Sequence, residues 1–185
     1  MSRNRRALSI TIVAVVGLLI IGSLVVGRPS ASGTPSYPPA GSTTSPAGAA
    51  AETTRGLVVS ALAAAGLQAE DVLSPFRPAE AARLAASPRI VIRGVIPNDP
   101  DHGRVVIYEL LTTGDAATAA REQAAYVGGG IGRIQFPPDA RFTIRIVGTT
   151  VVFYVWSEGS SPDVERATAV STALGTLGVG VDIPR

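Results

Sequence analysis

The feature that most constrains this chain is an uncharged apolar segment near its beginning. Residues 7–27 read ALSITIVAVVGLLIIGSLVVG and contain no charged side chain. As a helix, these 21 residues would extend about 31 Å at about 1.5 Å per residue, close to the thickness of the hydrocarbon core of a bilayer. The apolar region of a secretory signal is shorter, about 7 to 15 residues. The segment therefore predicts a retained transmembrane helix.

The charges on either side of this segment predict its orientation. Arg3, Arg5 and Arg6 precede it, whereas only Arg28 follows it directly. Cytoplasmic flanks of membrane helices carry the excess of basic residues. We therefore expect residues 1–6 to form a cytoplasmic tip and the rest of the chain to be extracytoplasmic.

A cleaved signal peptide is the alternative interpretation. Ser30, Ala31 and Ser32 give the small-x-small pattern that a signal peptidase accepts. Cleavage there would release a secreted form of the same domain, so both interpretations place the domain outside the cytoplasm.

Residues 28–53 differ in composition from everything that follows them. They contain five prolines, many Ser, Thr, Gly and Ala residues, and Tyr37 as the one large apolar side chain. Such a segment buries too little apolar surface to offset the entropy lost on ordering. It predicts a disordered tether between the membrane helix and one folded domain at residues 54–185.

The charge balance of the expected domain argues against nucleic-acid binding. Residues 54–185 carry 12 Arg and 13 acidic residues, so the excess of basic residues lies in the N-terminal segment. Without a basic face, the electrostatic attraction to phosphates that dominates nonspecific nucleic-acid binding has no source. The chain also has no cysteine, which excludes disulfides, thiolate metal sites and cysteine nucleophiles.

Hydrophobic periodicity and turn residues predict an α+β domain. Helical patterns begin at Thr53 or Thr54 and end at Gly66, and a short second helix is expected over residues 78–86. The remainder predicts a β-β-α-β-β-α order, with strands at 89–96, 104–111, 141–147 and 151–156, and helices at 115–126 and 161–178. We expect a four-stranded, mostly antiparallel sheet with the helices packed on one face.

The single histidine, His102, lies in a turn beside Asp99 and Asp101. As a calcium loop, this segment would place Pro100 and His102 where oxygen ligands are needed, so the register fails. No G-x-S-x-G nucleophile elbow occurs in the chain. The sequence predicts a hairpin turn here and no catalytic, cofactor-binding or metal-binding residue.

The glycine-rich segment Gly128-Gly129-Gly130-Ile131-Gly132-Arg133 superficially resembles a phosphate-binding loop. It follows a helix instead of joining a strand to a helix, and no Lys-Ser or Lys-Thr pair ends it. It predicts a helix stop followed by a flexible connector.

Aromatic residues in the last expected strand leave two interpretations open. Tyr154 and Trp156 alternate with Phe153 and would share one face of the sheet. Beside Arg141 and Arg145, that face could bind a partner or a glycan. Alternatively, the two side chains fill the second face of the sheet against the N-terminal helices.

Three segments resemble a known group of proteins: Ile107-Tyr108-Glu109, residues 133–139 (RIQFPPD) and residues 152–156 (VFYVW). Together with the alanine-rich helix between the first two, they are similar to small membrane-anchored extracytoplasmic proteins of high-GC bacteria that have no assigned function. The resemblance covers about residues 88–178. It implies an envelope protein and implies nothing about a mechanism.

The sequence therefore predicts a single-pass cell-membrane protein that presents a noncatalytic extracytoplasmic domain to an envelope partner, either a protein or a wall polymer. The alternative from another class is a hydrolase that uses two carboxylates as acid and base. Its candidate residues are Asp99, Asp101, Asp139 and Glu158.

Overall fold

The structure is a computed structural model that describes residues 47–72 and 75–184. The expected cytoplasmic tip at residues 1–6, the expected membrane helix at 7–27 and the expected tether up to residue 46 lie outside the described residues. Within the described part of the chain, every helix is too short or too polar to cross a membrane.

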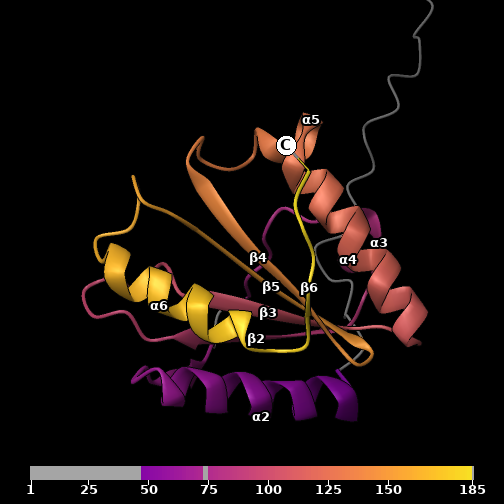
Figure 1. The fold of residues 1–185 in the computed structure, drawn as a ribbon, viewed down its shortest axis with the longest axis horizontal. Coiled ribbons are helices and arrows are strands. Elements are labelled where there is room, and N and C mark those ends of the chain that lie inside the picture. The colour runs from indigo at the N-terminus through magenta and orange to yellow at the C-terminus, as the bar shows by residue number, and fades with distance from the viewer. Residues whose placement is uncertain (1–46, 73–74, 185) are drawn as a thin grey trace, which may run out of the picture. The chain divides into compact units, whose positions relative to one another are not determined.

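One antiparallel sheet of six strands forms the middle of the described domain (Figure 1). The strands lie in the order β1-β2-β3-β5-β4-β6, and each neighbouring pair is antiparallel. They are β1 (Ala69–Asp71), β2 (Arg89–Gly94), β3 (Arg104–Glu109), β4 (Ala140–Val147), β5 (Thr150–Ser157) and β6 (Val179–Gly180). The α+β class and the antiparallel sheet are thus confirmed.

The expected number of four strands is wrong. β2, β3, β4 and β5 are the four strands that the sequence predicts, and they form the centre of the sheet. β1 and β6 add one short strand at each edge, with three and two residues. Their sequences, AED and VG, are too short to show an alternation of apolar and polar residues.

Helices cover both faces of the sheet, which corrects the expectation that they pack on one face. α2 (Ala49–Ala64) and α6 (Val164–Gly175) contact one face, and α4 (Thr113–Gly128) contacts the other together with the short α3 (Ala82–Ala85) (Figure 1). A last short helix, α5 (Gly130–Arg133), follows α4 where a flexible connector was expected.

Strand β5 shows why two layers of helices are needed. Val152, Tyr154 and Trp156 pack with α2 and α6, whereas Val151 and Phe153 pack with α4. Both sets of side chains are buried. Because successive side chains of a strand point to opposite faces, a strand that is apolar at every position requires cover on both sides.

The first helix begins earlier than its sequence pattern predicts. α2 begins at Ala49 instead of at Thr53 or Thr54, so its first turn includes the end of the segment expected to be tether. Gly48 has no side chain with which to cap the helix. Instead, Oε2 of Glu109, at the end of β3, accepts hydrogen bonds from the amides of Gly48 (2.7 Å) and Ala51 (3.1 Å).

Two other helices also begin at residues different from the expected ones. The N-cap of α4 is Thr112, whose hydroxyl accepts a hydrogen bond from the amide of Asp115. The N-cap of α6 is Asp163 instead of Ser161, and its carboxylate accepts from the amide of Arg166. In both cases a polar side chain just before the helix satisfies an amide of its first turn.

Candidate functional site

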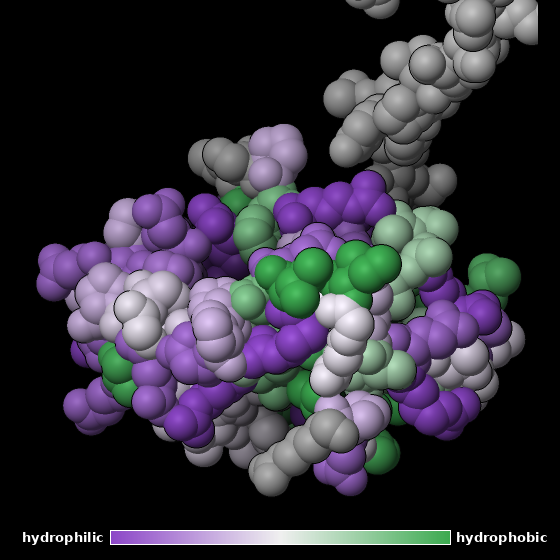
Figure 2. All heavy atoms as spheres, turned by 90° about the horizontal axis from the view of Figure 1, so that it is seen from above, coloured by the Kyte–Doolittle hydropathy of each residue, from purple (hydrophilic) through white to green (hydrophobic). Residues whose placement is uncertain are grey.

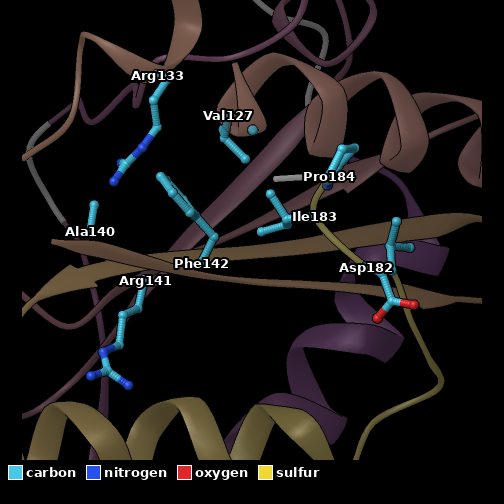
Figure 3. A pocket seen from close by; sticks show the side chains of 10 residues that line it. Val127, Arg133, Ala140, Arg141, Phe142, Asp182, Ile183 and Pro184 are labelled. Carbon is cyan, nitrogen blue, oxygen red and sulfur yellow. The ribbon is translucent and has the colours of Figure 1, made fainter. Parts of the chain in front are cut away.

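A cavity of about 550 Å³ lies beside the outer end of strand β4 (Figure 3). Its walls come from the C-terminal end of α4, from α5, and from the chain segment that follows β6. Figure 3 shows the side chain of Phe142 rising from β4 into this space, between Arg133 on one side and Ile183 on the other. The lining residues are Val127, Gly128, Arg133, Ala140, Arg141, Phe142, Val181, Asp182, Ile183 and Pro184.

Aromatic packing fixes the floor of this cavity. The ring of Phe142 stacks on Phe153 with a centroid separation of 6.3 Å, and the ring of Phe136 meets Phe142 edge-on at 5.0 Å. The guanidinium of Arg133 lies 5.4 Å from the centre of the Phe142 ring. It also donates to the backbone oxygens of Pro137 and Pro138. The backbone of Pro137 and Pro138 therefore holds the guanidinium of Arg133 over the ring of Phe142.

Two glycines allow the walls to approach each other. A Cβ atom at Gly128 would lie 2.5 Å from the backbone oxygen of Pro184, so only glycine lets the C-terminal segment cross the end of α4. A Cβ atom at Gly132 would collide with the backbone oxygen and the ring of Tyr126. The glycine-rich segment is therefore closely packed at its two ends, whereas Gly129 and Gly130 between them have open space where a Cβ would lie.

The turn of α5 presents two large aliphatic side chains to solvent. Ile131 is 77% exposed and Ile134 is 80% exposed. Figure 2 looks down on the end of the molecule that carries α5, and it shows hydrophobic residues gathered among hydrophilic ones. Arg133, which lines the cavity, lies between the two isoleucines in sequence, so the exposed residues belong to the same short turn as one of its walls.

The outer edge of β4 is only partly covered by β6. The pairing involves Arg145 with Gly180 and Ile146 with Val179, followed by a hydrogen bond from the amide of Val181 to the oxygen of Ile144. Among the described residues, no strand pairs with residues 140–143 on this edge. The residues 140–142 of β4 that are unpaired on this edge therefore line the cavity.

A second cavity of about 500 Å³ lies at the other end of α4. Its lining includes Glu109, whose carboxylate already caps α2, and Leu111, which is 94% exposed. The remaining lining residues are Gly48, Arg83, Ala86, Ser87, Pro88, Leu110 and Asp115. This cavity adjoins the first described residues of the chain.

The cluster around His102 comes together as a buried structural contact. Asp99 is 3% exposed, and its carboxylate lies 2.5 Å from Nδ1 of His102. Its other oxygen accepts from Oγ of Ser161 at 3.3 Å. The carboxylate thus lies between the serine and the imidazole, whereas a hydrolase triad needs the imidazole in the middle. Asp101 is exposed in the same turn.

The carboxylates of Asp139 and Glu158 both lie at the end of the β4–β5 hairpin. Asp139 accepts hydrogen bonds from Oγ of Ser157 (2.7 Å) and from the amide of Gly159 (2.6 Å). Glu158 forms an ion pair with Arg141. Asp139 lies on an exposed turn just before β4, and Glu158 lies on another just after β5. Each carboxylate is already bound, Asp139 by hydrogen bonds and Glu158 by an ion pair.

The hydrogen bond from Gly159 and, next, that from Ser157 lower the pKa of Asp139 below its ordinary value. This shift favours the ionised form. A general acid needs the opposite shift.

The aromatic residues of β5 belong to the core. Tyr154 and Trp156 are buried, and the hydroxyl of Tyr154 donates to the backbone oxygen of Ala167 in α6 at 3.3 Å. Arg141 lies 5.5 Å from the Trp156 ring, and Arg145 donates to the oxygens of Leu177 and Gly178 at the end of α6. The interpretation that these aromatic residues fill the second face of the sheet is confirmed.

One buried charged cluster was missed by the sequence analysis. The side chain of Glu80 is 4% exposed, with Nε of Arg77 at 2.6 Å and a guanidinium nitrogen of Arg89 at 3.7 Å. The hydroxyl of Tyr108 is buried in the same region. Burial is the main cause that raises the pKa of Tyr108, and the negative charge of the nearby Glu80 adds to it. No sequence signal marked Glu80, because a single acidic residue in an expected alanine-rich helix is typical of an exposed position.

Within the described residues, no group of three histidine or acidic side chains is arranged to hold a metal ion. No protein-family model, no curated protein and no solved structure matches this chain.

Proposed function

We propose that this protein is a single-pass membrane protein whose extracytoplasmic domain binds a protein partner of the cell envelope without catalysis. The observation that carries the binding part is the cavity over Phe142, which combines an apolar floor, the cation of Arg133 and an uncovered strand edge. Ligand sites are typically concave and apolar with a few directed polar groups. This cavity is concave and has an apolar floor at Phe142, but most of its exposed lining is polar, so its directed polar groups are the larger part of the site.

The membrane part of the proposal is supported by the sequence. Residues 7–27 carry no charge, and the basic residues before them exceed those directly after them. This pattern favours a helix that spans the bilayer with residues 1–6 in the cytoplasm.

Site-specific photocrosslinking in intact cells tests the binding proposal. A photoreactive residue in place of Ile134, which is exposed and directly follows the cavity-lining Arg133, is expected to give one reproducible protein adduct. The matched control replaces Leu111, which is also an exposed aliphatic residue but precedes the opposite end of α4. α4 has 16 residues, so its two ends lie about 24 Å apart. Equal adducts from both positions, or none from Ile134, would contradict the proposal.

A reporter fusion tests the topology separately. An enzyme that is active only outside the cytoplasm, fused after Arg185, is expected to be active in cells. The size of the fusion on a denaturing gel shows whether the segment before residue 30 is retained. An inactive reporter contradicts the orientation, and a shortened N-terminus supports the secreted form.

A further inference from the structure

We propose that the ligand of the cavity is an extended polypeptide segment that adds to the free edge of β4. It would place an apolar side chain against Phe142 and a carboxylate against Arg133. This inference rests on the proposed function, since it names the chemistry of the partner.

The free edge follows from the hydrogen-bonding register of β4. The oxygen of Ile144 accepts from Val181, so the backbone groups of Ile144 face outward, away from β5. Backbone groups of alternate residues point to the same side of a strand, so those of Phe142 and Ala140 also face outward. The amide of Ala140 is used by the oxygen of Pro137. The amide and oxygen of Phe142 and the oxygen of Ala140 remain for an added strand.

The C-terminal segment of the chain stops short of this edge. In the register of β6, Ile183 would lie opposite Phe142, but β6 ends at Gly180 and only Val181 continues the ladder. The segment then turns toward α4, where Pro184 lies against Gly128. The space between the departing segment and β4 is the cavity. An exposed strand edge beside such a space accepts an extended peptide by main-chain pairing.

The charges around the cavity favour a carboxylate on the ligand. Among the described residues, Arg133 has no carboxylate within 4.0 Å; the two hydrogen bonds that it makes leave other guanidinium donors available. Asp139 is close enough for Arg133 to lower its pKa slightly, but its oxygens already bind Ser157 and Gly159. Asp182 lies on the opposite side of the cavity (Figure 3). An acidic group of the ligand is therefore matched to Arg133.

A polypeptide fits these features better than a wall polymer or a lipid surface. A glycan stacks on an open aromatic face, but Phe153 and Arg133 lie against the faces of the Phe142 ring. An aliphatic side chain of a peptide needs only the part of this half-buried ring that stays accessible. Lipid could contact the exposed Ile131 and Ile134. It has no donors or acceptors arranged to pair with the recessed backbone of Phe142.

Panning of a phage library of random linear peptides against the full-length protein in detergent micelles supplies the probe. We expect enriched sequences with a β-branched or aromatic residue at a constant spacing from Asp or Glu. Substitution Arg133→Gln is expected to weaken the best peptide about tenfold or more, since charge-assisted hydrogen bonds are the strong ones. Arg121→Gln, on an exposed position of α4, is the matched control and should leave binding unchanged.

An N-methyl scan of the same peptide tests strand addition without altering the protein. Methylation of alternate amides should abolish binding with a period of two, because only every second amide faces β4. A scan without this period, enriched peptides without acidic residues, or a library that yields no binder would overturn the inference. If Ile134 still gives a protein adduct in cells, the proposed function stands and only the strand-addition mode fails. A lipid adduct at Ile134 overturns both.

Discussion

Tyr108 and Tyr154 show how one residue type meets two different environments in this sheet. Both are buried, on opposite faces. Tyr154 donates to the oxygen of Ala167, whereas the hydroxyl of Tyr108 makes no hydrogen bond of normal geometry among the described residues and has the carboxylate of Glu80 nearby. Burial raises the pKa of both phenols. A buried polar group without a good hydrogen bond carries a desolvation cost that no partner offsets, so the two residues should respond differently to loss of the hydroxyl.

We therefore expect Tyr154→Phe to lower the free energy of unfolding by about 1 kcal/mol at neutral pH, and Tyr108→Phe to leave it unchanged or to raise it. Above about pH 10, where a tyrosine in the unfolded chain ionises, the wild type should lose stability, because its folded-state pKa values are raised. Tyr108→Phe should make this alkaline loss shallower. Urea unfolding at pH 7 and at several alkaline pH values measures both effects. A Tyr108→Phe variant that is as unstable as Tyr154→Phe at pH 7 would show that the Tyr108 hydroxyl is bonded.

Asp139 gives the corresponding prediction in acid. Its pKa is lowered in the folded state by the hydrogen bonds from Gly159 and Ser157. A lowered pKa contributes stability above the unfolded-state value of about 3.9, and this contribution is lost as the pH falls through the folded-state value. Asp139→Asn should therefore melt at a lower temperature than the wild type at pH 7, and the two melting curves should converge at low pH. Asp101→Asn, an exposed position in another turn, serves as the control and should run parallel to the wild type.

At the scale of elements, the sequence predicts what local patterns control and misses what distant residues control. The β4–β5 hairpin was expected because its apolar residues alternate, and Gly148 adopts the positive φ of 58° that a tight turn needs. The start of α2 was misplaced because its cap, Glu109, lies 61 residues from Gly48. The cavity was missed for a similar reason. It exists only because the C-terminal segment crosses α4 at Gly128, which no local pattern indicates.

The dependence of α2 on Glu109 can be measured directly. Glu109→Ala leaves the amides of Gly48 and Ala51 without their acceptor and should cost about 1–2 kcal/mol of unfolding free energy. Glu109→Gln keeps an acceptor oxygen but removes the negative charge near the positive end of the helix dipole, so its loss should be smaller. Glu52→Ala is the control, since Glu52 is in the first turn of the same helix but exposed. Equal effects of Glu109→Ala and Glu52→Ala in urea denaturation would refute the cap.

At the scale of the whole molecule, both helical layers are needed because the central strands are apolar on both faces. α2 supplies part of one layer, with Ala51, Val58 and Leu62 fully buried against the sheet. The composition of residues 28–53 did not reveal that α2 begins within this segment. Ala and Gly near its end are as typical of a tether as of a closely packed helix. Small residues allow the first turn of α2 to approach its neighbours, and a hydrophobicity pattern gives little weight to such positions.

The folded domain therefore begins no later than Ala47, which packs against the core, and not at the residue 54 that composition suggested. A fragment of residues 47–185 keeps Ala51 and the amides that bind Glu109, so it should unfold cooperatively. A fragment of residues 54–185 loses the first turn of α2 and leaves the Glu109 carboxylate without those donors. It should be less stable by about 2–4 kcal/mol, from one lost cap and the apolar surface of the first turn. Urea denaturation of the two fragments followed by circular dichroism measures the difference. Equal midpoints would place the domain limit inside α2 and show that its first turn contributes nothing to the core.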